Sequence, residues 1–95
     1  MSPFRPDIPL HVAEVIRSFH HDLKRSIKAA VYGIATDPEC GEPLMRELDG
    51  LWKYRVRRFR IVYAIDRKAR VIRLIAVGHR QSIYENLTAK LRTKR

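Results

Sequence analysis

Basic and apolar side chains alternate over residues 52–57, in the second half of the sequence. Lys53, Arg55 and Arg57 occupy every second position there, so on a β-strand they would share one face at a spacing of about 7 Å. Arg58 lies in the tight connection that follows, and Arg60 opens the next predicted strand beside Arg57. Like charges on neighbouring strands repel one another, so stability alone does not favour this arrangement. The cluster is either a solvated sheet face or, as the planar arginine fork favours, a surface that binds phosphate.

A second group of polar side chains follows a later apolar run. Gly78, His79 and Arg80 come directly after the predicted strand over residues 71–77. His79 is the one side chain there whose unperturbed pKa of about 6.5 suits proton transfer near neutral pH. Tyr84, four residues after Arg80, can stack on a base or offer a hydroxyl group. We expect His79 to face the arginine cluster; the alternatives are an ordinary surface histidine and a tyrosine that packs on the sheet.

Other kinds of chemistry find little support in the sequence. The single cysteine, Cys40, excludes a disulfide framework or a cysteine cluster for metal, and its acidic loop does not favour a reactive thiolate. His11, His20 and His21 lack a thiolate or carboxylate arrangement at metal-ligand spacing. The four glycines are isolated, so there is no glycine-rich phosphate loop. We therefore predict no cofactor and no metal.

The formal net charge of +10 is concentrated in one half of the chain. Residues 1–50 carry six basic and eight acidic side chains, a net charge of −2. Residues 51–95 carry 14 basic and two acidic ones, a net charge of +12. Such sorting points to a face that binds a polyanion. No apolar run is long enough to span a membrane and no secretory signal is visible, so we expect a cytoplasmic protein.

Hydrophobic periodicity predicts a single α+β domain over residues 1–95. Apolar residues at helical spacing predict two helices, the second with Asp22 as its N-cap, and they should form a hairpin whose apolar stripes need a sheet to cover them. The expected order is an edge strand over 4–8, helices over 9–20 and 22–36, a linker over 37–50, strands over 52–56, 59–65 and 71–77, a helix over 81–91, and a frayed basic tail over 92–95.

Segments of these strands resemble motifs of a known family. Residues 54–57 read Tyr-Arg-Val-Arg, and residues 59–63 read Phe-Arg-Ile-Val-Tyr. Residues 77–80 read Val-Gly-His-Arg, and Tyr84 follows. In this combination they resemble the core of RelE/ParE-superfamily toxins from bacterial type II toxin–antitoxin systems. The resemblance implies the RelE-like fold, a small twisted antiparallel sheet of three to four strands packed against an N-terminal helical hairpin, with a C-terminal helix.

The resemblance also implies an activity. RelE-like members are ribosome-dependent endoribonucleases that cut mRNA and inhibit translation, whereas ParE-like members poison DNA gyrase and generally lack the basic catalytic set. The positions implicated in RNA cleavage correspond here to Arg55, Arg57, Arg60, Arg80 and Tyr84. The best-known RNA-cleaving member has lysines where Arg55 and Arg57 stand, and arginine is a poor proton acceptor. We predict mRNA cleavage; the alternatives are a non-cleaving gyrase inhibitor of ParE type, a catalytically silenced ribosome- or RNA-binding homologue and, more distantly, a DNA-binding regulator.

In the mechanism that this resemblance implies, the RNA 2′-OH attacks the adjacent phosphate without a metal. The protein stabilises the extra negative charge on the pentacoordinate phosphate and moves two protons. The expected partners are a cognate acidic antitoxin, the ribosome with its rRNA, and mRNA, and operator DNA is bound through the antitoxin. We expect Arg60 and Arg80 to bind the scissile phosphate and His79 to transfer a proton. Arg55 and Arg57 should contact the flanking RNA backbone, and Tyr84 should position a base or the 2′-OH. Lys53 and Arg58 should make further contacts to the RNA.

Overall fold

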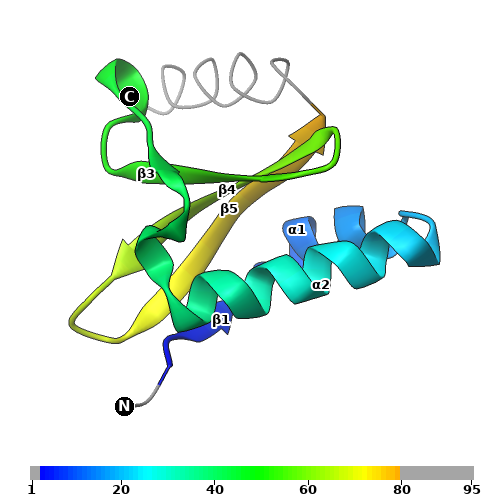
Figure 1. Cartoon of the computed structure of the whole chain (residues 1–95), viewed down its shortest axis with the longest axis horizontal. Helices are drawn as coiled ribbons and strands as arrows, with labels where there is room; N and C mark the ends of the chain where they lie inside the picture. The colour runs from blue at the N-terminus through cyan, green and yellow to red at the C-terminus, as the bar shows by residue number, and fades with distance from the viewer. Residues whose placement is uncertain (1–2, 80–95) are drawn as a thin grey trace.

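The computed structural model describes residues 3–79 of the chain. Within that range, two α-helices lie against a five-stranded sheet (Figure 1). The predicted helix over 81–91, the tail over 92–95, and the candidate residues Arg80 and Tyr84 lie outside the described residues. No helix among residues 3–79 is long and apolar enough to cross a membrane.

Three long antiparallel strands form the centre of the sheet. They are β3 (Leu51–Val56), β4 (Phe59–Asp66) and β5 (Val71–His79), close to the predicted ranges. The turn between β3 and β4 has two residues, and the turn between β4 and β5 has four. The predicted meander of three strands is therefore confirmed.

Two short strands complete the sheet in the order β1-β5-β4-β3-β2. β2 (Glu42–Pro43) is antiparallel to β3, and β1 (Arg5–Asp7) is parallel to β5. Pro6, which has no N–H to donate, lies in an edge strand as predicted. The sheet is thus mixed and has five strands, rather than being wholly antiparallel with three or four. β2 is too short to show a periodicity, and the parallel pairing joins distant parts of the chain, so no local pattern indicates either.

The helical hairpin consists of α1 (Leu10–Arg17) and α2 (His21–Thr36). α1 is shorter than the predicted helix over 9–20, because residues 18–20 form the turn between the two helices. The N-cap of α2 is His20, not Asp22: the His20 Nδ1 atom accepts a hydrogen bond from the Asp22 N–H at 3.3 Å. Asp22 lies instead in the first turn, where its negative charge complements the helix dipole.

The sheet separates two apolar clusters. The larger lies between the sheet and the helices, and its fully buried side chains include Ile27, Ile34, Ile61, Tyr63 and Leu74. The smaller lies on the opposite face, where Val62 is buried with Leu48 of the linker. Successive side chains of a strand point to opposite faces, which is why Val62 leaves the cluster of its neighbours Ile61 and Tyr63. Each buried side chain of this size contributes about 1.5–3 kcal/mol, so both faces of the central strands are held in place.

The loop after α2 is tied to the centre of the sheet. The buried Tyr63 hydroxyl donates a hydrogen bond to the Pro38 carbonyl oxygen at 2.6 Å. Gly41 passes so close that a Cβ atom added to it would lie 2.6 Å from the Tyr63 hydroxyl oxygen, and closer still to the Lys53 carbonyl oxygen. The 3-10 turn Pro38–Cys40 and strand β2 are thereby fixed beside β3.

Replacing Gly41 by alanine should destabilise the fold, because the new Cβ atom has no room between the backbone and the buried phenol. Gly33→Ala is the matched control, since nothing lies within 4 Å of its Cβ position inside α2. Overpacking costs about 1–3 kcal/mol, whereas alanine is favoured over glycine inside a helix by about 1 kcal/mol. Chemical denaturation should therefore show opposite changes in the free energy of unfolding. A Gly41→Ala protein as stable as the wild type would contradict the close packing.

Replacing Tyr63 by phenylalanine should lower the free energy of unfolding by about 1–3 kcal/mol, because the buried Pro38 carbonyl loses its donor. Burial raises the pKa of Tyr63 from 10.0 to about 12. The unfolded chain therefore loses this proton at a lower pH than the folded chain does, and the stability advantage of the wild type over Tyr63→Phe should shrink as pH rises from 10.0 to about 12. Denaturation curves across that range measure the advantage; a constant difference would show that the phenol is not buried as described.

Candidate nucleic-acid interface

The β3–β4 hairpin places two arginines directly opposite each other. Arg55 on β3 pairs with Arg60 on β4, and Arg60 pairs in turn with Gly78 on β5. Directly opposed residues lie on the same face, with Cβ atoms about 4.5–5.5 Å apart. This face is turned away from the helices, because the neighbouring Tyr54 and Ile61 pack into the helix-side cluster. Cations from two strands thus share one face as predicted, but Arg60 lies opposite Arg55 and not beside Arg57, where it was expected.

The surroundings of the pair suit the binding of an anion. Arg55 is exposed, Arg60 is half-buried, and Gly78 adds no side chain beside them. Among the side chains that the structure describes, no carboxylate oxygen lies within 4.0 Å of either guanidinium group. Two opposed positive charges without a nearby counter-charge destabilise a sheet unless an anion binds between them. We call the row formed by Arg55, Arg60 and Gly78 the phosphate-binding face, after the ligand that we expect it to bind.

Arg57 and Arg58 form the two-residue loop of the hairpin. The prediction that Arg57 shares a strand face with Lys53 and Arg55 is therefore wrong, because β3 ends one residue before it. Its φ angle of 57° lies in the left-handed region, which such tight loops require and which glycine or asparagine adopts at lower cost. The Arg55 Nε–H donates a hydrogen bond to the Arg57 carbonyl oxygen at 3.2 Å. The loop arginines thus extend the positive charge beyond the end of the sheet.

Lys53 lies on the same face as Arg55 but further from the hairpin loop. Its Nζ atom is 3.3 Å from Glu42 Oε1, on the neighbouring strand β2. This carboxylate offsets the ammonium charge, so the positive potential is concentrated at the arginine end of the face. Glu42 is a residue that sequence reasoning missed, because the two-residue strand β2 leaves no pattern to indicate the pairing.

His79 lies at the same end of the sheet as the phosphate-binding face but on its other side. It pairs with Phe59, and the two rings meet edge to face with their centroids 5.0 Å apart. Phe59 also contacts Phe19 of the helical hairpin, which identifies this as the helix side. The prediction that His79 faces the arginine cluster is therefore wrong. Adjacent strand residues point to opposite faces, so the register that sets Gly78 beside Arg60 turns His79 away.

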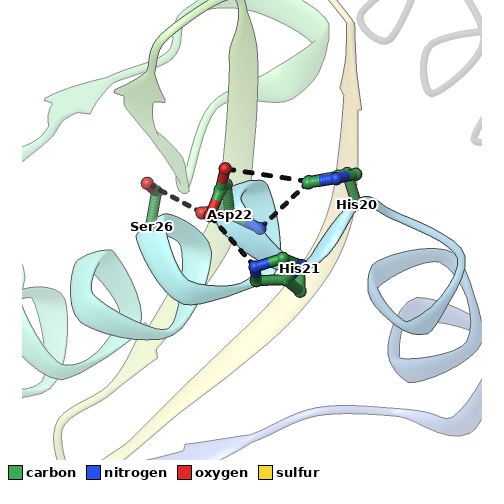
Figure 2. A network of polar contacts seen from close by, with 4 residues as sticks. All are labelled: His20, His21, Asp22 and Ser26. Atoms are coloured by element: carbon green, nitrogen blue, oxygen red, sulfur yellow. Dashed lines mark hydrogen bonds and ion pairs between the residues drawn. The ribbon is translucent and has the colours of Figure 1, made fainter.

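Three exposed side chains at the start of α2 bring possible metal ligands together. Ligand atoms of His20, His21 and Asp22 lie within 4.8 Å of one another (Figure 2). Asp22 Oδ1 is 3.3 Å from His21 Nε2, and Asp22 Oδ2 is 3.9 Å from His20 Nδ1. The two imidazole rings are stacked, however, with centroids 4.7 Å apart and planes at 28°, so their in-plane lone pairs do not converge on one point. Because His20 Nδ1 also accepts the Asp22 N–H, the arrangement fits a helix cap better than a metal site.

Cys40, in the 3-10 turn after α2, is a poor candidate for nucleophilic chemistry. Partial burial, and then the nearby Asp37 carboxylate, raise the pKa of its thiol above the ordinary value. The thiol is therefore protonated near neutral pH, whereas the thiolate is the nucleophile. The raised pKa agrees with the expectation that this loop does not favour a reactive thiolate.

Comparisons with known proteins identify the family. A family model described as the ParE toxin of the type II toxin–antitoxin system parDE matches residues 11–84. No curated protein matches the sequence. The RelBE2 toxin–antitoxin complex from Mycobacterium tuberculosis matches in structure with 23% identity, 84% of this chain and 94% of that chain covered, and a TM-score of 0.76. Free RelE from E. coli matches with 18% identity and a TM-score of 0.76, and the match covers 96% of this chain and 98% of that chain. The archaeal RelE–RelB complex from Pyrococcus horikoshii matches with 18% identity and a TM-score of 0.70, and the match covers 84% of this chain and 98% of that chain.

The two comparisons agree with the geometry. The likeness to the RelE structures shows that the helical hairpin and sheet form the RelE-like α+β fold, as predicted. The family match covers most of the chain, including the whole hairpin that carries the phosphate-binding face. The chain therefore belongs to the ParE toxin family and is a toxin of a type II toxin–antitoxin system in the RelE/ParE superfamily.

Proposed function

We propose that this toxin is a ribosome-dependent mRNA endonuclease of the RelE type. The observation that carries the proposal is the phosphate-binding face, where Arg55 and Arg60 lie opposite each other with no carboxylate neighbour within the described residues. A planar guanidinium group binds a phosphate through two parallel hydrogen bonds. Its pKa, above about 12, keeps it charged at any working pH. Such a pair, with Arg55 exposed and Arg60 half-buried, suits the backbone of an RNA strand.

The chemistry that fits this face is internal transesterification. The RNA 2′-oxygen forms a bond to the adjacent phosphorus while the bond from phosphorus to the 5′-oxygen breaks, which leaves a 2′,3′-cyclic phosphate and a 5′-hydroxyl. One proton leaves the attacking hydroxyl and one is delivered to the departing oxygen. Arg55 and Arg60 stabilise the extra negative charge of the pentacoordinate phosphate and take no part in proton transfer, because they are not deprotonated. The nucleophile comes from the substrate, so no protein nucleophile is required.

Proton transfer is assigned to His79, at the end of β5. His79 and the phosphate-binding face lie on opposite sides of the sheet. An RNA strand that contacts both must therefore pass around the end of the sheet beside Gly78. Arg80 and Tyr84 follow in the sequence. We assign to Arg80 a second contact to the scissile phosphate, and to Tyr84 the positioning of a base or of the 2′-OH.

A cognate antitoxin is the expected protein partner. Two of the similar structures are, by name, toxin–antitoxin complexes. An exposed cationic face on a translation inhibitor needs a partner that covers it, and an acidic segment that folds on binding meets this need. Ribosome, mRNA and rRNA are the proposed targets of the free toxin in the cytoplasm, and operator DNA is contacted through the antitoxin.

Inhibition of DNA gyrase is the alternative function, and the ParE description of the matching family model favours it. The same cationic face would then serve binding without cleavage, as it would in a catalytically silenced homologue. Expression of the toxin separates these functions: mRNA cleavage truncates translated messages and leaves DNA intact, whereas gyrase inhibition damages DNA and leaves messages intact.

Removing Arg60 should slow cleavage of mRNA on programmed ribosomes by about 10²–10³-fold, because one transition-state contact is lost. Arg55→Ala should have a similar effect, since both side chains share the phosphate-binding face. Lys68→Ala is the matched control: it removes one exposed positive charge in the turn between β4 and β5, at the other end of the sheet. The variants are compared at saturating toxin, after their folding has been checked by thermal denaturation. Equal rates for all three variants and the wild type would refute the assignment.

Replacing His79 by alanine should lower the cleavage rate by about 10²-fold or more, because general acid–base catalysis contributes about that much. His79→Phe is the matched control, since it keeps an aromatic ring against Phe59 but cannot carry a proton. Both variants should therefore be slow, although His79→Phe retains the packing. If His79→Phe cleaved at the wild-type rate, the role of His79 would be structural and another residue would move the protons.

A further inference from the structure

Three aromatic side chains form a row on the helix side of the sheet, at the end where the β3–β4 loop lies. Phe19 belongs to the turn between α1 and α2, Phe59 begins β4, and His79 is the last described residue of β5. The centroids of the Phe19 and Phe59 rings lie 5.0 Å apart with planes at 58°, and those of Phe59 and His79 lie 5.0 Å apart with planes at 87°. The row therefore connects the helical hairpin with the imidazole to which proton transfer is assigned.

The position of Phe59 is set by this row. Its ring is half-buried, but among the described side chains it belongs to neither of the two apolar clusters. The pairing that turns His79 away from the phosphate-binding face places it directly opposite Phe59. The aromatic residue at position 59 is therefore better explained by its two ring contacts than by filling of the core.

Phe19, which supports Phe59, is itself fixed in place. Its N–H donates a hydrogen bond to the Ile16 carbonyl oxygen at 3.1 Å, and the Ser18 hydroxyl donates one to the Val15 carbonyl oxygen at 2.6 Å. The Phe19 side chain packs against the helix-side cluster. The first ring of the row is therefore held by the helical hairpin, and the contact between the two phenyl rings passes this restraint on to Phe59.

His79 is exposed, and an exposed imidazole at the end of a strand can adopt several staggered rotamers. The edge-to-face contact favours the rotamer in which the imidazole meets the Phe59 ring, because such aromatic pairs are more stable than their buried area alone implies. Proton transfer requires a nitrogen atom within about 2.6–3.2 Å of the atom that gives up or takes the proton. An imidazole already held in one orientation reaches this geometry more often than one that changes rotamer.

We propose that Phe59 is a positioning residue for cleavage: its ring holds the His79 imidazole in the orientation that transfers the proton, and Phe19 supports it. The inference rests on the proposed function, because it takes proton transfer as the role of His79. In this arrangement Phe59 acts on the imidazole and not on the RNA. Removing the Phe59 ring should therefore slow the chemical step without weakening the binding of ribosomes.

The test measures single-turnover cleavage of mRNA on programmed ribosomes by the wild type, Phe59→Leu, Phe59→Tyr and Phe19→Leu. Phe59→Leu should lower the rate at saturating toxin by about 2- to 12-fold, which corresponds to the loss of one edge-to-face contact. Its affinity for ribosomes should be unchanged. Phe59→Tyr keeps a ring and should cleave at nearly the wild-type rate. Phe19→Leu should have a smaller effect in the same direction, because it removes only the support.

A double variant separates positioning from a general effect on the fold. If Phe59 acts through the imidazole, Phe59→Leu should not slow cleavage further in a His79→Ala background, whereas loss of the fold would slow cleavage in both backgrounds. The Hα–Hβ coupling constants of His79, measured by NMR, report its χ1 rotamer without any cleavage. They should indicate one rotamer in the wild type and in Phe59→Tyr, and averaged rotamers in Phe59→Leu.

Phe4→Leu is the matched control, since Phe4 is also a half-buried phenylalanine but lies at the other end of the sheet, with the Arg70 guanidinium carbon 4.7 Å from its ring centroid. It should leave the cleavage rate and the His79 coupling constants unchanged. The proposal is overturned if Phe59→Leu cleaves like the wild type, if it slows cleavage equally with and without His79, or if its His79 rotamer is that of the wild type. Failure of the proposed function looks different: the wild type would leave ribosomal mRNA intact, while the His79 rotamer would still change in Phe59→Leu.

Discussion

The register of the antiparallel ladder formed by β3, β4 and β5 is the constraint on which the other features depend. A loop of only two residues forces Arg55 to pair with Arg60 and Tyr54 with Ile61. A slip by one residue would move every side chain of a strand to the other face. The apolar partners would then leave the helix-side cluster and the arginines would be buried beneath α2. The apolar core and the cationic face are therefore two consequences of one pairing, and burial in the core opposes any slip that would relieve the repulsion between the arginines.

The same register explains why the positive charge gathers at one end of the molecule. Towards the linker, the far face of the sheet is closed by Leu48 over Val62, and Glu42 offsets the charge of Lys53. The Tyr63 hydroxyl fixes the linker there through the Pro38 carbonyl oxygen. Towards the hairpin loop, no described carboxylate forms an ion pair with Arg55, Arg57 or Arg60. A polyanion is therefore attracted to the loop end of the face that carries Arg55 and Arg60.

Sequence reasoning predicted the elements better than it predicted the directions of the side chains. Alternation in residues 52–56 and helical spacing in α2 are strong local signals, because the core selects for them. The same alternation placed Arg55 correctly, whereas Arg60 was expected beside Arg57 and lies opposite Arg55 instead. Arg57 was not, since a pattern of period two does not show where a strand stops and a loop begins. His79 was placed on the wrong face because its orientation depends on the pairing of Gly78 with Arg60, a long-range feature. The parallel pairing of β1 with β5 and the Glu42–Lys53 ion pair also join distant segments and leave no local trace.

The proposed function requires that the cationic hairpin end binds RNA in order to cut it. The most direct measurement incubates the wild-type toxin with a defined mRNA, with and without translating ribosomes, and maps the ends of the products. A ribosome-dependent endonuclease should cleave within the translated region only when ribosomes are present and should leave 2′,3′-cyclic phosphate and 5′-hydroxyl ends. Intact mRNA in both reactions, together with inhibition of gyrase supercoiling by the same preparation, would contradict it.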